Sequence, residues 1–92
     1  MHELGITQRL LEVVLERAVA AGAHRIEDIQ LEIGEESAVA PDALALYWPL
    51  VSRGTMAEGA RLDIATAADP LAFRVVAIDV DDGEPAADRL DG

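Results

Sequence analysis

The chain of 92 residues contains no cysteine. It therefore has no disulfide framework, iron–sulfur cluster, thiolate zinc site or cysteine nucleophile. Aromatic residues make up only 3% of the sequence, and no apolar run approaches the roughly 18 residues that a membrane span needs. The N-terminus shows neither a basic n-region nor an apolar h-region. We therefore expect no secretion signal and a cytoplasmic location.

Basic residues are also scarce: 7 stand against 18 acidic ones, which gives a formal charge of −11. Nucleic acids and anionic membrane surfaces attract proteins through lysine and arginine, so neither is expected as a partner. Hydrophobic residues nevertheless make up 51% of the chain, which is enough for a packed core. The length is that of one small domain.

The hydrophobic pattern predicts, in order, a helix, a strand, a helix and two strands, over residues 4–21, 26–33, 42–52, 60–66 and 71–80. Gly22 is placed to end the first helix, and Pro41 fits the first turn of the second. Pro49 conflicts with the second helix, because proline lacks the N–H that a helix interior uses, and it should kink or shorten this element.

Residues 26–66 form a β-α-β unit whose strands can pair in parallel through a right-handed crossover. The short link at 66–70 favours an antiparallel hairpin between the last two strands. The prediction is an α+β domain over residues 1–82, with two helices packed on one face of a three-stranded mixed sheet. Residues 83–92 are predicted to be a flexible acidic tail.

The N-terminal tripeptide Met1-His2-Glu3 is the feature with the clearest chemical potential. A histidine at position two offers three adjacent nitrogens, namely the α-amine, its own backbone amide and its imidazole. Such a tetragonal nitrogen set suits Ni(II) or Cu(II), and Glu3 supplies an amide or carboxylate as a fourth donor. The alternative interpretation is that His2 is a solvated terminal residue.

Other polar residues give weaker indications. Glu35, Glu36 and Asp42 lie in predicted loops at one end of the sheet, where they form either a solvated acidic rim or a supplementary carboxylate for a metal. His24 is interpreted as a surface histidine at a turn. The sequence offers neither a nucleophile–base pair nor a deep pocket, so an enzyme is not expected.

Several segments, in their order and spacing, resemble the HypA/HybF family of nickel metallochaperones, which serve the maturation of [NiFe]-hydrogenase and sometimes of urease. The matching segments are Met-His-Glu-Leu at 1–4, Leu-Glu-Ile-Gly-Glu at 31–35 followed by Ser37, Pro-Asp-Ala-Leu at 41–44, Gly-Thr at 54–55, Glu-Gly-Ala at 58–60 and Leu-Asp-Ile at 62–64. The last predicted strand looks like the closing strand of the family, so the resemblance covers about residues 1–80.

The resemblance implies the same α+β fold and a nickel site at Met1, His2 and Glu3. It implies Ni(II) as cargo, and as partners a HypB-like GTPase and the large subunit of a [NiFe]-hydrogenase. Whether the protein acts as a monomer or as a homodimer is left open by the sequence.

Two departures from the family pattern bear on function. The family carries a zinc domain with two Cys-x-x-Cys pairs between its last two strands, whereas here that stretch is reduced to about Ala67–Pro70 and no zinc is expected. Some members place an assisting carboxylate where this chain has Ala40, so Asp42 and Glu36 are the weaker candidate ligands. The alternative function is an adaptor or assembly factor that keeps the fold and a docking surface without transferring metal.

Overall fold

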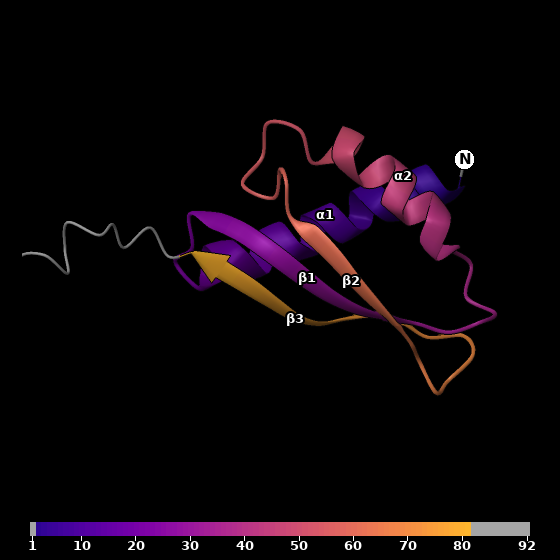
Figure 1. Ribbon diagram of the computed structural model, residues 1–92. Coiled ribbons are helices and arrows are strands. Elements are labelled where there is room, and N and C mark those ends of the chain that lie inside the picture. Colours follow the sequence, from indigo (N-terminus) through magenta and orange to yellow (C-terminus); the bar gives the residue numbers. More distant parts are fainter. Residues whose placement is uncertain (1, 82–92) are drawn as a thin grey trace, which may run out of the picture.

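The computed structural model describes residues 2–81, with side chains from Glu3 onward. Its elements are α1 (His2–Ala20), β1 (Arg25–Ile33), α2 (Pro41–Val51), β2 (Arg61–Thr66) and β3 (Phe73–Asp81) (Figure 1). The predicted α+β class, the order of the elements and the mixed three-stranded sheet are confirmed. The predicted tail at 83–92 lies outside the described residues.

Helix α1 follows the predicted pattern closely. The buried stripe of α1 runs through Thr7, Leu10, Val14 and Ala18, at spacings of three and four residues. Gly22 follows the helix with a φ of +74°, the left-handed conformation that terminates many helices. No helix within residues 2–81 is long and apolar enough to cross a bilayer.

Helix α2 differs from the prediction at its end. Pro41 occupies the first turn, as expected, because its missing N–H has no partner there in any case. The helix also continues through Pro49 and ends two residues later, at Val51. The proline therefore lies in the last turn, where it removes one hydrogen bond of the helix, and the helix ends two residues beyond it.

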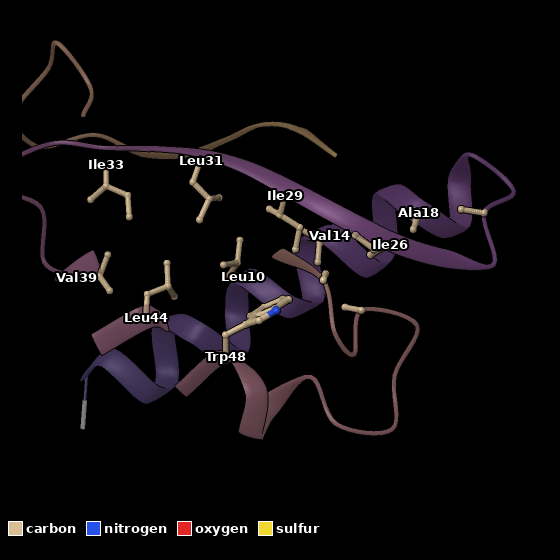
Figure 2. Packing of buried hydrophobic residues seen from close by; sticks show 13 residues of the cluster. Leu10, Val14, Ala18, Ile26, Ile29, Leu31, Ile33, Val39, Leu44 and Trp48 are labelled. Atoms are coloured by element: carbon tan, nitrogen blue, oxygen red, sulfur yellow. The ribbon is translucent and has the colours of Figure 1, made fainter. Parts of the chain in front are cut away.

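The core lies between the helices and one face of the sheet (Figure 2). Ile26, Ile29 and Leu31 of β1 are almost completely buried. Their side chains point toward the helices, where Leu44 and Trp48 of α2 complete the cluster (Figure 2). Because β1 is the central strand, its alternating apolar residues supply most of the sheet's contribution to the core.

The strand order is β2-β1-β3, which corrects one prediction. β1 and β2 pair in parallel, as the β-α-β unit predicts, but β3 pairs antiparallel with β1 and not with β2. The expected hairpin between the last two strands is therefore wrong. The link of residues 67–72 is short, yet it needs to cross only two strand spacings, about 10 Å, to reach the other side of β1.

Gly34 explains how so short a link makes this crossing. It follows directly after β1, and a Cβ atom at this position would collide with the backbone of Asp69 and Pro70. The Gly34 N–H donates to the carbonyl of Ala72 at 2.8 Å, and the Glu36 N–H donates to the carbonyl of Pro70 at 2.7 Å. The link thus packs directly against the end of β1, which only glycine permits.

We expect the substitution Gly34→Ala to lower the free energy of unfolding by about 1–3 kcal/mol, because the added methyl group overpacks a backbone contact. Gly5→Ala is a matched control. Gly5 lies in α1, where an added methyl group would meet no other part of the chain within 4 Å, so alanine there should raise stability by about 1 kcal/mol. Urea denaturation followed through Trp48 fluorescence measures both; equal effects of the two substitutions would contradict the close packing at Gly34.

Candidate metal centre

The predicted tripeptide lies at the start of α1. Met1 falls outside the described residues, and of His2 only the backbone is described, as the first residue of the helix. The Glu3 side chain is partly buried. The structure therefore places the backbone of His2 and Glu3 at one end of a long helix (Figure 1).

Local hydrogen bonding fixes this first turn. The hydroxyl of Thr7 donates to the carbonyl of Glu3 at 2.6 Å, and the Thr7 side chain is completely buried. The first four amides of an α-helix have no carbonyl partner within the helix. Coordination of a metal by the amide nitrogens of residues 2 and 3 would therefore break no helical hydrogen bond.

Glu3 lies beside an open groove of about 410 Å³. The opposite walls are formed by the end of β1, by the loop that follows it and by the first residue of α2, that is, by residues 33–35 and 37–41, with Thr66 of β2. The fold thus brings the N-terminal turn of α1 next to the loop in which a supplementary carboxylate is predicted.

The groove distinguishes among three nearby acidic residues, namely Glu35 and Glu36 of the loop and Asp42 in the first turn of α2. All three are exposed, but only Glu35 contributes to the wall of the groove. Ala40 lines the groove and precedes α2 without a side-chain hydrogen bond to the helix. The sequence alone favours Glu36 and Asp42 over Glu35, because neighbouring loop positions cannot be assigned to a wall before the path of the loop is known.

Among the described side chains, no group of three or more histidine, aspartate or glutamate residues is arranged to hold a metal ion. His24 lies in the link between α1 and β1 and is exposed. An N-terminal chelate does not need such a cluster, since its donors are the amine, backbone nitrogens and a single imidazole.

A thiolate zinc site does not fit this chain. The segment between β2 and β3 comprises only residues 67–72, and it packs against Gly34. The sequence has no cysteine to supply the thiolates of a closed structural site.

A family model described as hydrogenase/urease nickel incorporation, metallochaperone, HypA matches residues 1–72. The family that this model describes is one of nickel metallochaperones. The chain belongs to the HypA family, which confirms the resemblance found in its sequence.

Curated relatives are similar over most of the domain. The hydrogenase maturation factor HypA of Klebsiella pneumoniae is 45% identical over 65 residues, which cover 71% of this chain and 57% of that protein. HypA of Trichormus variabilis is 47% identical over 64 residues, or 70% of this chain and 54% of that protein. The chain thus matches little more than half the length of these relatives.

A solved structure is similar in fold. The solution structure of the Ni metallochaperone HypA from Helicobacter pylori aligns with a TM-score of 0.76 and covers 86% of this chain and 97% of the solved one. Its sequence identity is only 15%, so this likeness concerns the fold alone.

The hydrogen bond from Thr7 to Glu3 generates a prediction for the start of α1. Thr7→Val keeps the side-chain shape but removes the hydroxyl, so we expect a loss of about 1 kcal/mol in unfolding free energy. Amide hydrogen exchange at residues 6–9, whose N–H groups donate to the carbonyls of the first turn, should become faster. Thr7→Ser is the control: it keeps the hydroxyl, and exchange at residues 6–9 should stay close to that of the original chain. Equal exchange in Thr7→Val would contradict an anchoring role for this bond.

Proposed function

We propose that this protein is a nickel-binding metallochaperone that carries Ni(II) during the maturation of a [NiFe]-hydrogenase, and that it does so without a structural zinc domain. The observation that carries the proposal is the sequence Met1-His2-Glu3, of which His2 begins α1 and Glu3 lines an open groove. Membership of the HypA family supports nickel as the cargo. A cytoplasmic location agrees with this role.

The proposed donors are the Met1 amine, the amide and imidazole of His2, and an amide or carboxylate of Glu3. Among the loop carboxylates, Glu35 is the one that shares the groove with Glu3. Asp42 and Glu36 remain weaker candidates, because both are exposed outside the groove. Nickel would thus bind at the surface, where a receiving protein can reach it.

A HypB-like GTPase and the large subunit of a hydrogenase are the proposed partners. The named role of the relatives as hydrogenase maturation factors supports this assignment. An adaptor that keeps the fold but transfers no metal is the alternative, and a nickel titration separates the two.

We expect one Ni(II) ion per chain in calorimetry and visible absorption, with a square-planar absorption band. The protein must be untagged and have a free Met1 amine. Because α-amines ordinarily lose their proton near pH 8, and because a metal binds the deprotonated form, affinity should rise as the pH is raised from about 6 to 8.

The chain offers a matched pair of variants for this titration. His2→Ala removes the imidazole and should abolish the absorption band. His24→Ala removes the only other histidine, which is exposed at the α1–β1 link, and should leave binding unchanged. Unchanged affinity in His2→Ala would refute the assigned ligands, and no binding by the folded original chain would favour the adaptor.

Removal of metal should not destabilise the fold. Structural zinc couples metal binding to folding, so a chelator denatures proteins that depend on it. Here we expect the melting temperature in excess EDTA to match that in buffer, as measured by circular dichroism. A large drop would reveal a structural metal site that the sequence and fold do not indicate.

A further inference from the structure

Strand β3 forms one edge of the sheet and pairs with β1 alone among residues 2–81 (Figure 1). It is nine residues long, contains no proline, and none of its residues is fully buried. Phe73, Val75, Ile78 and Val80 pack against the core yet remain partly exposed. A long apolar edge strand is a template for another strand, and proteins normally cover it.

The backbone groups of β1 show which way each residue pairs. The carbonyl of Ile33 accepts from the N–H of Ala67 on the β2 side, whereas the N–H of Gly34 donates to Ala72 on the β3 side. Alternate residues of a strand direct their backbone groups to opposite neighbours. The backbone N–H and C=O groups of residues 29, 31 and 33 therefore point toward β2 and not toward β3.

The outward-facing residues of β3 follow from this alternation. The partners of residues 29, 31 and 33 in the register are Ile78, Val75 and Phe73, so their N–H and C=O groups point away from β1. The Ile26 N–H donates to the carbonyl of Met56, in the loop before β2, and so points away from β3. The backbone groups of Val80, the partner of Ile26 in β3, therefore also point away from β1. Val76 has no partner in the β1–β3 register and forms a β-bulge. Because of this extra residue, the outward-facing Val75 and Ile78 are three positions apart and not two.

We propose that β3 pairs antiparallel with β3 of a second copy of this chain, joining two sheets into one of six strands. Only one symmetric register brings all four outward residues together. It places Phe73 opposite the partner's Val80, and Val75 opposite the partner's Ile78. In both pairs each residue presents its backbone hydrogen-bonding groups and an apolar side chain to the other.

Charge complementarity supports the same register. It places Arg74 opposite the partner's Asp79, twice by symmetry. Arg74 pairs in β1 with Glu32 and Asp79 pairs with Asp28, so both lie on the sheet face away from the core. The Arg74 guanidinium donates to the Glu32 carboxylate at 2.6 Å. The Arg74 side chain is nevertheless 65% exposed, so it can bind a second carboxylate as well. Opposite charges at facing positions stabilise a strand pair.

The edge also offers space for the partner's side chains. A hollow of about 330 Å³ lies between α1 and β3, with Leu10, Val13, Phe73 and Val75 among its walls. The partner's Ile78 and Val80 would lie next to this hollow. Arg17 donates to the carbonyl of Val75 at 3.4 Å, a long bond that the incoming strand would replace.

Analytical ultracentrifugation of the complete chain tests the proposal. We expect a concentration-dependent shift toward twice the monomer mass of 9.8 kDa. Arg74→Asp and Asp79→Arg should each weaken dimerisation about tenfold, since each places like charges opposite each other. The double variant restores two opposite-charge pairs and should regain most of the affinity, with circular dichroism confirming that each variant is folded.

Disulfide cross-linking provides a second test of the register that does not depend on charge. In Arg74→Cys/Asp79→Cys the two thiols of one chain lie about 13 Å apart along the strand, whereas thiols of facing copies come within disulfide reach. Mild oxidation should yield a covalent dimer from the double variant, whereas each single variant, which has no facing thiol, should stay mainly without the covalent cross-link. A chain that sediments as a monomer up to about 1 mM, or a double variant that gives no covalent dimer, would overturn the proposal.

Discussion

The architecture depends on the backbone contact between Gly34 and the link of residues 67–72. This contact lets six residues carry the chain across the end of β1, so that β1 becomes the central strand. The central position buries Ile26, Ile29 and Leu31 beneath both helices. The same contact holds the start of the β1–α2 loop, through the hydrogen bonds at Gly34 and Glu36, and this loop forms a wall of the groove beside Glu3.

Local patterns predicted the elements but not the order of the strands. The alternation over 26–33 and the helical spacing over 4–21 are properties of short segments, and both elements formed within two residues of the predicted bounds. The position of β3 is a tertiary property. A short link is compatible with a hairpin and with a crossing over the end of one strand, and the choice rests on the absence of a side chain at Gly34. In the sequence this glycine indicates only the end of a strand.

The candidate site likewise has a part that the sequence could predict and a part that it could not. The tripeptide Met1-His2-Glu3 can be found in the sequence because the chelate is formed by consecutive residues, and the fold contributes nothing to their proximity. The surroundings cannot be found there, because the wall facing Glu3 comes from residues about 30 or more positions away. Glu35 therefore emerged as the loop carboxylate at the groove only once the loop path was known, and its neighbour Glu36 did not.

The two helices both begin at this groove, since Glu3 of α1 and Pro41 of α2 each contribute to its walls. Aligned peptide dipoles give the N-terminus of a helix a partial positive charge, which disfavours a nearby cation by about 0.3–1 kcal/mol. A divalent ion held there would be opposed by two such dipoles at once. If nickel binds there as proposed, these dipoles oppose the attraction of the Glu3 and Glu35 carboxylates in the same groove and so weaken its retention.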